Sequence, residues 1–289
     1  MKDQNEVIIQ EHAAKAFQVK PEDVKIVNRF LGGMSHLTYH IQVKGQDYTF
    51  RVIGADGNLF VDRKIERENI NRVIPLGINN ETIFFDEVSG DKAAKYVEGT
   101  VLTQVDIKPH LQDIAAVLKK LHTSCIKPAS DYGHVERLAL YETFTNENDP
   151  QYDLLKSKWI EIFKTRQDKP RVFCHGDAQR SNMVLATDRL YLLDWEYSGL
   201  NEIYYDIASF GNIQFSDALD LLDAYVGRKA TKEEQDAVKF YRMFQALQWH
   251  QVATRKDMIG LSEVVHFDFK MLAEKYLNLA ETLYNEIKE

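Results

Sequence analysis

Two neighbouring stretches, CHGDAQRSNMVL at residues 174–185 and LYLLDWEYS at residues 190–198, contain the polar residues that decide the fold. The first carries His175, Asp177 and Asn182 in the pattern H-x-D-x-x-x-x-N, and the second carries Asp194. Protein kinases use this spacing in their catalytic loop. An aspartate can accept the proton of a hydroxyl, while an asparagine and a second aspartate are hard oxygen ligands suited to Mg²⁺. The pattern therefore predicts phosphoryl transfer from a nucleotide.

Two other interpretations of this stretch fit the residues less well. The polar residues could form an ordinary turn between two buried strands, but Asp194 directly after the apolar run LYLL favours the catalytic interpretation. A zinc site on His175 is rejected, because no second histidine lies at ligand spacing.

The rest of the chain is expected to fold as a small sheet followed by helices. Residues 6–17 and 62–76 have helical spacing, while alternation predicts strands within 24–43, at 48–53 and at 81–88. From residue 106 onward helices dominate, and their expected positions are 106–124, 151–166, 216–226, 232–256 and 266–287. Two short apolar runs, RVFCHGD and RLYLLDWE, are expected to be strands joined by a polar loop. The shift in composition near residue 98 predicts one boundary, between domains 1–97 and 98–289.

Composition excludes several classes of protein. The 289 residues are 44% hydrophobic and 28% charged, which is ordinary globular usage. The formal net charge is −8, and this argues against a nucleic-acid partner. Cys125 and Cys174 form no disulfide framework, the first residues do not resemble a signal peptide, and no apolar run is long enough to span a membrane. We expect a cytoplasmic protein without membrane insertion. Its oligomeric state is not predicted.

The two polar stretches resemble a known family. CHGDAQRSN together with LLDWEYSGLNEIYYDIASF is similar to the aminoglycoside phosphotransferase and choline/ethanolamine kinase group, and more closely to the choline/ethanolamine kinase branch. The resemblance implies an α+β, protein-kinase-like fold of two lobes, with ATP and Mg²⁺ as cofactors. It implies that Asp177 deprotonates the acceptor hydroxyl and that Asn182 and Asp194 bind Mg²⁺. Gln179 and Glu196 would support the site.

The N-terminal half supplies candidates for the nucleotide site. Gly32, Gly33 and Ser35 lie between two expected strands, where glycines let backbone amides approach phosphates. Arg51 stands where protein kinases carry a lysine, and arginine keeps the charge and can bind phosphate through two N–H groups.

Two further features belong to the same expected site. The acidic partner of Arg51 is expected on the 62–76 helix, with Glu66 as first choice and Glu68 as the alternative. The stretch at 93–99 resembles the hinge, where the backbone near Tyr96 and Val97 would meet adenine.

The acceptor is expected to be a small cationic amino alcohol, because aromatic residues that can surround an ammonium group are dense in the C-terminal half. Glu196, Tyr197 and Trp249 are the substrate-binding candidates, although aromatics at helical spacing are more often core. Trp249 resembles a tryptophan of bacterial choline kinases, so choline is the first choice.

Two departures from the choline kinase pattern keep other acceptors open. The stretch at 207–216 lacks the carboxylate that typically lines the ammonium pocket, and a second tryptophan after Trp249 is absent. Ethanolamine, thiamine and aminoglycosides remain alternatives, the last because six acids lie within 216–236. A degenerate protein that binds a nucleotide without turnover is a further alternative.

Overall fold

The computed structural model describes residues 3–30, 36–54, 56–145 and 149–288. By internal contacts the chain divides into two compact units. The first comprises residues 1–113, 128–130 and 180–198, and the second comprises residues 114–127, 131–179 and 199–289. The predicted boundary at residue 98 concerns functional lobes and stays a prediction.

An antiparallel sheet of five strands forms the centre of the first unit. Its spatial order is β1-β2-β3-β5-β4. The strands are β1 (Val24–Arg29), β2 (His36–Val43), β3 (Gln46–Ile53), β4 (Thr82–Phe85) and β5 (Lys92–Lys95). In the pairing of β3 with β5, Arg51 lies directly opposite Lys92. Side chains directly opposite each other lie on the same face of a sheet, so this register brings two cations together.

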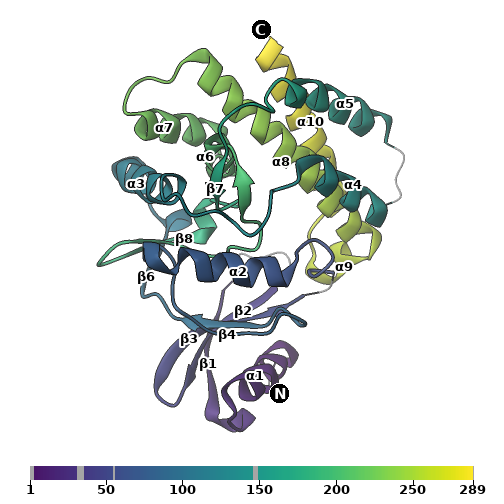
Figure 1. Cartoon of the computed structure of the whole chain (residues 1–289). Coiled ribbons are helices and arrows are strands. Elements are labelled where there is room, and N and C mark those ends of the chain that lie inside the picture. The colour runs from purple at the N-terminus through teal and green to yellow at the C-terminus, as the bar shows by residue number, and fades with distance from the viewer. Residues whose placement is uncertain (1–2, 31–35, 55, 146–148, 289) are drawn as a thin grey trace. The chain divides into compact units, whose positions relative to one another are not determined.

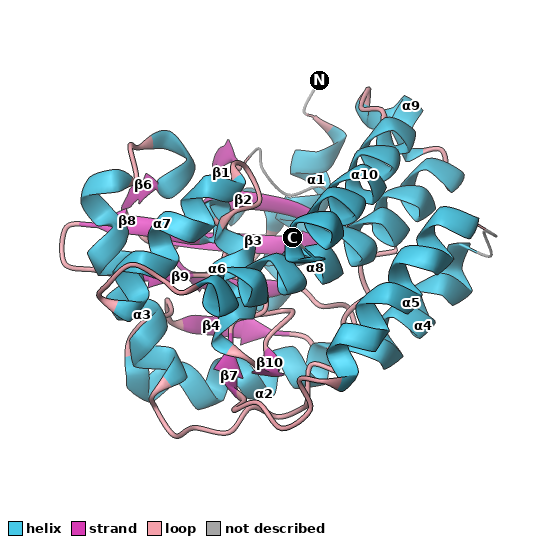
Figure 2. Cartoon of the chain, turned by 90° about the horizontal axis from the view of Figure 1, so that it is seen from above, coloured by secondary structure: helices cyan, strands magenta, loops and turns pink. Residues whose placement is uncertain are grey.

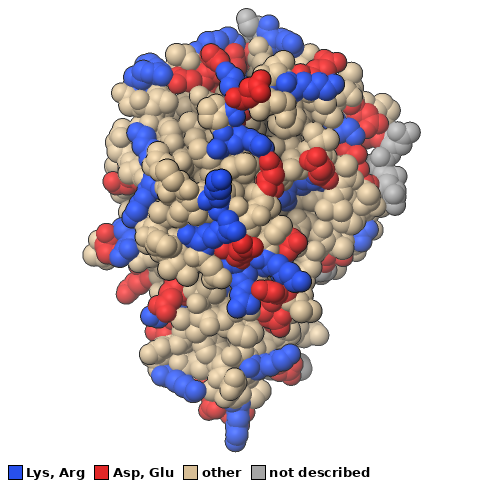
Figure 3. Space-filling model, viewed as in Figure 1, with Lys and Arg blue, Asp and Glu red and all other residues tan. Residues whose placement is uncertain are grey.

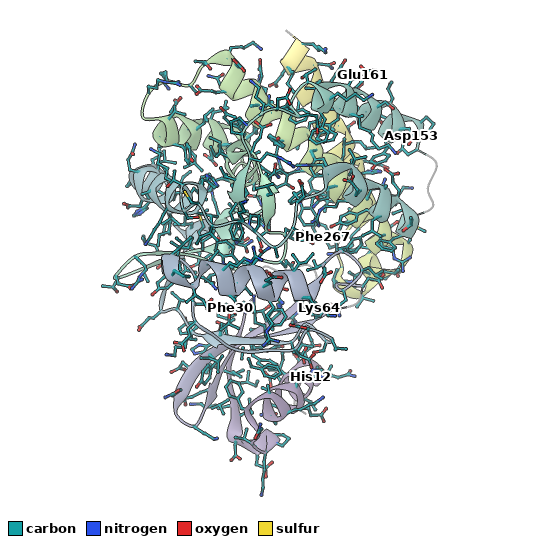
Figure 4. The ribbon with its side chains drawn as sticks, viewed as in Figure 1. His12, Phe30, Lys64, Asp153, Glu161 and Phe267 are labelled. Carbon is teal, nitrogen blue, oxygen red and sulfur yellow. The ribbon has the colours of Figure 1, made fainter. Side chains whose placement is uncertain are left out.

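Helix α1 (Gln4–Phe17) covers part of this sheet, as Figure 1 shows. Ile9 and Ala13 are fully buried against apolar side chains of the strands, including Ile41 and Phe50. His12, labelled on α1 in Figure 4, contacts Asp91 through Nδ1 at 2.7 Å. The helix expected at 6–17 is therefore confirmed, and its apolar face is what the sheet buries.

Helix α2 (Arg63–Val73) follows β3 and places a polar stripe in the interior of the first unit. Asp62 caps its N-terminus by accepting hydrogen bonds from the backbone N–H groups of Lys64 and Ile65. The buried face contains Glu66 together with Ile70 and Val73, which follow it at helical spacing. Glu66, the first choice as the partner of Arg51, therefore lies on the buried face of α2.

A second, three-stranded sheet completes the first unit, in the order β6-β8-β9. Its strands are β6 (Gly99–Val101), β8 (Met183–Ala186) and β9 (Leu190–Leu192). The expectation of a plain polar loop between the two apolar runs is wrong, because β8 lies within it and pairs with β9. The first run forms β7 (Val172–Cys174), which pairs with β10 (Gly199–Asn201) in the second unit. Strand β8 has four residues, which is too short for a pattern of alternation to appear in the sequence. Its pairing with β6 and β9 is what makes this segment a strand.

Helices make up most of the second unit, as the cyan ribbons of Figure 2 show. They are α3 (Leu111–His122, most of which belongs here), α4 (His134–Thr145), α5 (Pro150–Lys164), α6 (Ile203–Phe210), α7 (Phe215–Val226), α8 (Lys232–Met258), α9 (Leu261–Val265) and α10 (Phe269–Lys288). The helices expected at 106–124, 151–166, 216–226, 232–256 and 266–287 are present within a few residues. Helices α4, α6 and α9 were not anticipated. Helix α6 is buried on nearly all sides, so its sequence lacks the alternation of apolar and polar residues that predicts a helix.

The core of the second unit is aromatic and centres on α8. Trp159 of α5 is fully buried, and its ring stacks on Phe163 and Phe240 with centroids 4.7 and 4.9 Å away. Its indole N–H donates to the carbonyl oxygen of Phe240 at 3.1 Å. Tyr241 and Phe244 are buried beside it. Most aromatics of the C-terminal half therefore serve as core.

Charges are mixed over the surface. On the face in Figure 3, Lys and Arg are interspersed with Asp and Glu. The six acids between 216 and 236 are mostly engaged: Glu233 with Lys169, Glu234 with Arg228, Asp223 with Lys229 and Asp236 with Lys232. Along the described chain, the search for a helix of membrane-spanning length and hydropathy finds none.

We predict that Trp159→Ala lowers the free energy of unfolding by about 3–5 kcal/mol, because it removes a large buried ring and leaves a cavity. Urea denaturation followed by circular dichroism measures this change. Val88→Ala, at a side chain that is 90% exposed, is the control and should change stability by less than about 0.5 kcal/mol. A loss below about 1 kcal/mol in the tryptophan variant would show that the core closes around the gap.

Candidate active site

A buried cluster of charges in the first unit brings together residues that are far apart in the sequence. Its cations are Arg51, Arg63 and Lys92, and its anions are Glu66, Asp194 and Glu196. Three positive and three negative charges therefore balance. Because a buried charge is costly unless it is paired, this cluster is stable only as a whole.

Arg51 and Glu66 form the centre of the cluster. The Nη2 of Arg51 donates to both carboxylate oxygens of Glu66, at 2.8 and 2.9 Å. Its Nη1 donates to Oδ1 of Asp194 at 2.8 Å. The alternative partner, Glu68, instead contacts Arg72 on the exposed side of α2. The structure thus pairs Arg51 with Glu66, as expected, and adds Asp194 to the pair.

Arg63 and His36 hold Glu196. Arg63 donates Nη1 to Glu66 at 2.6 Å and to Glu196 at 2.8 Å. The Nε2 of His36 lies 3.1 Å from the same oxygen of Glu196. The Glu196 carboxylate, expected to bind substrate or support the site, is thereby occupied by basic side chains of its own unit. Sequence reasoning missed both Arg63 and His36.

Lys92 is a further residue that sequence reasoning missed. Its Nζ lies 3.3 Å from Glu66 and 3.5 Å from Asp194, so it shares both anions with Arg51. Only the strand register places it there, because Lys92 faces Arg51 across β3 and β5. The only hint of this role in the sequence is that Lys92 directly precedes the hinge-like stretch at 93–99.

The cluster shifts the acidities of its members. Burial opposes ionisation of Glu66, but Arg51, Lys92 and Arg63 together lower its pKa from 4.5 to about 2. Burial and the charge of Glu196 oppose ionisation of Asp194, yet Lys92 and Arg51 hold its pKa below the usual value. Both carboxylates are therefore anionic at neutral pH. Asp194 is the more accessible, with its side chain 33% exposed against 0% for Glu66.

Asp194 and Asn182 come from adjacent segments. The backbone N–H of Leu193, next to Asp194, donates to the carbonyl oxygen of Asn182 at 2.8 Å. Asp194 has a φ of +67°, in the left-handed region that aspartate tolerates better than most residues. Such backbone strain is concentrated at functional sites. An aspartate carboxylate and an asparagine amide on these segments form a donor set that suits Mg²⁺.

Two backbone amides of the hinge-like stretch are held in hydrogen bonds. The backbone N–H of Lys95 donates to Glu81, and that of Tyr96 donates to Asp47 at 3.2 Å, so both amides are occupied. The Tyr96 ring stacks on His40, with centroids 3.9 Å apart. Among the described residues, none hydrogen-bonds to the backbone of Val97. The predicted phosphate-loop residues Gly32, Gly33 and Ser35 lie outside the described part of the chain.

In the second unit, Asp206 holds the segment that leads to Asp177. Its two carboxylate oxygens accept the backbone N–H groups of His175 at 2.7 Å and Gly176 at 2.8 Å. His122 contributes Nε2 at 3.0 Å. Burial opposes ionisation of Asp206, but the contacts with His122 and His175 lower its pKa. Gly176 has a φ of +80°, a conformation that favours glycine.

Asp177 itself is half-buried and has Gln179 as a direct partner. Gln179 donates Nε2 to Oδ2 of Asp177 at 2.9 Å, and its amide oxygen accepts a hydrogen bond from Asn212. The hydrogen bond from the Gln179 side chain orients the Asp177 carboxylate through one of its two oxygens. The contact agrees with the supporting position expected for Gln179, while the catalytic roles stay predictions.

The predicted aromatic substrate residues occupy different environments. Tyr197, in the first unit, is 7% exposed and packs in its interior. Trp249, on α8 of the second unit, is half-buried. Their assignment to the acceptor stays a prediction.

We predict that Glu66→Gln lowers stability at neutral pH by about 3–5 kcal/mol, because it leaves buried cations without their shared anion. In this variant the free energy of unfolding should also depend less on pH below about 4.5. The folded pKa of Glu66 lies below its unfolded value, so its contribution is complete above pH 4.5 and is lost as pH falls toward about 2.

Unfolding free energies measured from pH 7 to pH 2 test this prediction. Glu234→Gln is the matched control, because Glu234 also has a pKa lowered to about 2, mainly by Arg228, but lies only half-buried at the start of α8. Equal stability losses in the two variants would contradict a special role for the buried cluster.

We predict that Asp206→Asn loosens the segment before Asp177. An amide presents only one acceptor, so one backbone N–H of His175 or Gly176 loses its partner, at about 1–3 kcal/mol. Amide hydrogen exchange at residues 175–177 should accelerate in this variant. Asp223→Asn, at the end of α7, should leave exchange there unchanged; unchanged exchange in Asp206→Asn would refute the anchoring role.

Comparisons with known proteins show which family the chain resembles. The sequence profile described as choline/ethanolamine kinase matches residues 27–218. Protein LicA of Haemophilus influenzae is 27% identical over 206 residues, which cover 66% of this chain and 61% of that protein.

Two solved structures show the same fold. The crystal structure of choline kinase LicA from Streptococcus pneumoniae superposes with a TM-score of 0.78 at 22% identity, covering 98% of this chain and 99% of the other. A structure of LicA in complex with AMP also gives a TM-score of 0.78 at 21% identity, covering 99% and 100%.

The predicted α+β, protein-kinase-like fold class is confirmed, with an antiparallel N-terminal sheet and a mostly helical C-terminal part. The profile covers more than half of the chain, and it includes the charge cluster, Asp177 and Asp206. The chain belongs to the choline/ethanolamine kinase family of phosphotransferases.

Proposed function

We propose that this protein transfers the γ-phosphoryl group of ATP to the primary hydroxyl of a cationic amino alcohol. Choline is the acceptor that the sequence favours, and ethanolamine is the other acceptor named by the family. The observation that carries the proposal is the buried pair of Arg51 and Glu66 with Asp194 attached to it, since kinases position phosphates with such a pair. The complex of LicA with AMP supports a nucleotide as the donor.

In this proposal each part of the site has a task. Arg51 positions the phosphates, with Glu66 fixing its guanidinium, and Gly32, Gly33 and Ser35 cover them. Val97 offers its backbone to adenine. Residues 1–97 would thus bind the nucleotide, and residues 98–289 would carry the catalytic and acceptor groups.

Asn182 and Asp194 would hold Mg²⁺. The ion, when bound, neutralises charge on the phosphate oxygens. The fit rests on hard oxygen donors and on the accessibility of Asp194. Asp177 accepts the proton of the acceptor hydroxyl, and Gln179 keeps its carboxylate oriented. The cytoplasmic location expected from the sequence stays a prediction.

We predict that Asp177→Ala and Asp177→Asn each lower kcat about 10²–10⁴-fold, since both remove the proton acceptor. ADP release with ATP and Mg²⁺ measures turnover against choline, ethanolamine, thiamine and kanamycin. ATP binding and thermal stability should change little in both variants. Asp188→Asn, at an exposed residue paired with Arg189, is the control and should retain full activity.

Two outcomes would contradict the proposal. Substantial turnover by Asp177→Asn would remove Asp177 as the base. ATP binding without ADP release for any acceptor would favour a degenerate, nucleotide-binding protein.

A further inference from the structure

Lys92 is held less firmly than the other cations of the buried charge cluster. Its Nζ lies 3.3 Å from Glu66 and 3.5 Å from Asp194, whereas Arg51 reaches the same two carboxylates at 2.8 Å. The side chain of Lys92 is also the most exposed of the three cations, at 13% against 4% for Arg51 and 3% for Arg63. Lys92 is therefore the cation that can leave its partners at the lowest cost.

The N–H groups of Arg51 are largely committed within the protein. Its Nη2 donates to both oxygens of Glu66 and to the carbonyl oxygen of Gly90 at 3.2 Å, and its Nη1 donates to Asp194. A lysine ammonium carries three N–H donors on a flexible four-carbon chain. Lys92 has two ion-pair partners among the described residues, so its ammonium can offer a further N–H to a bound group.

The strand register directs Lys92 to the same side of the sheet as Arg51. The two residues lie opposite each other in the pairing of β3 with β5, so their side chains share one face. The next pair in this register, Phe50 and Ala93, is fully buried on the other face, in the apolar core that includes residues of α1. Lys92 therefore lies on the face where the proposed function places the phosphates.

The distance along the chain from Lys92 to Val97 agrees with this placement. An extended chain rises ~3.3 Å per residue, so Lys92 lies roughly 16 Å along the chain from Val97. In the proposed function Val97 offers its backbone to adenine, and the phosphates are at the opposite end of the nucleotide. Lys92 is thus placed for the phosphates rather than for the base.

The charge balance of the cluster supplies the reason for such a contact. Its three cations and three anions cancel, so no positive charge is spare. A nucleoside triphosphate still carries negative charge with Mg²⁺ bound, and a charge in a poorly screened site must be paired. With Mg²⁺ bound, Asp194 no longer needs Lys92 as a counter-charge, and the ammonium can turn to the phosphates while Arg51 stays on Glu66.

We propose that Lys92 binds the β- and γ-phosphates of the nucleotide, as a second cation beside Arg51. This inference rests on the proposed kinase function and adds a phosphate-binding residue to it. The pattern of protein kinases points to the cation of β3, whereas Lys92 lies on β5 and reaches the site through the strand register. Phosphate oxygens accept strong, charge-assisted hydrogen bonds from an ammonium group.

Nucleotides of different length give a matched test, because AMP lacks the phosphates that Lys92 would contact. Isothermal titration calorimetry of the full chain with Mg²⁺ compares AMP with the non-hydrolysable triphosphate AMP-PNP. Lys92→Met should weaken binding of AMP-PNP about 10- to 100-fold, because a charge-assisted contact is lost, and should change AMP affinity less than about twofold. In EDTA the loss should be smaller, since Asp194 then still holds Lys92 in the unaltered protein.

Two variants and one spectroscopic measurement separate phosphate binding from folding. Lys25→Met removes an exposed lysine from β1 of the same sheet and should leave both affinities unchanged. Lys92→Arg keeps the charge and should retain most of the preference for the triphosphate. If Lys92→Met does not fold, NMR of the otherwise unaltered protein with ¹³C-methylated lysines replaces it. The Lys92 signal, assigned by its loss in Lys92→Arg, should move with AMP-PNP and Mg²⁺ but not with AMP.

Three results would overturn the inference. An unchanged preference for AMP-PNP over AMP in Lys92→Met, or a Lys92 signal that does not respond to the triphosphate, would leave Lys92 an ion-pair partner only, and the kinase proposal would stand. Equal losses with AMP and AMP-PNP would assign Lys92 to the shape of the site rather than to the phosphates. No binding of any nucleotide by the unaltered protein would contradict the kinase proposal itself, and this inference with it.

Discussion

The buried carboxylate of Glu66 is the interaction on which the first unit depends. Three cations, Arg51, Arg63 and Lys92, lie within ion-pair distance of it, and two of them face each other across neighbouring strands. Without Glu66 these like charges would repel one another in a medium that screens them poorly. Because Arg51 also contacts Asp194, the same carboxylate fixes the position of the proposed magnesium ligand.

A buried carboxylate, that of Asp206, also organises part of the second unit. Asp206 accepts two consecutive backbone N–H groups and thereby fixes the turn that precedes Asp177. In the mechanism that we propose, Asp206 contacts no reacting atom and acts as a positioning residue. A buried acid that is fully hydrogen-bonded orients the loop at little cost, whereas an apolar residue there would leave both donors unsatisfied.

The buried charges of the first unit cancel, three positive against three negative. The net charge of −8 over the whole chain therefore arises outside this cluster and says little about the acceptor.

The sequence by itself determined the fold class and indicated the chemistry that we propose. The spacing from Asp177 to Asn182 and Asp194 is local, and the strong helical periods of α3, α7 and α10 are visible in the chain. It also singled out Glu66, because the period of α2 places it beside Ile70 and Val73.

Only the tertiary structure decided which charges meet. Lys92 joins Arg51 through strand register, Glu196 contacts Arg63 across 133 residues, and β8 exists because β6 and β9 pair with it. Local patterns report which face of an element is apolar, but the energy of a charge depends on its distant neighbours and on the water they exclude.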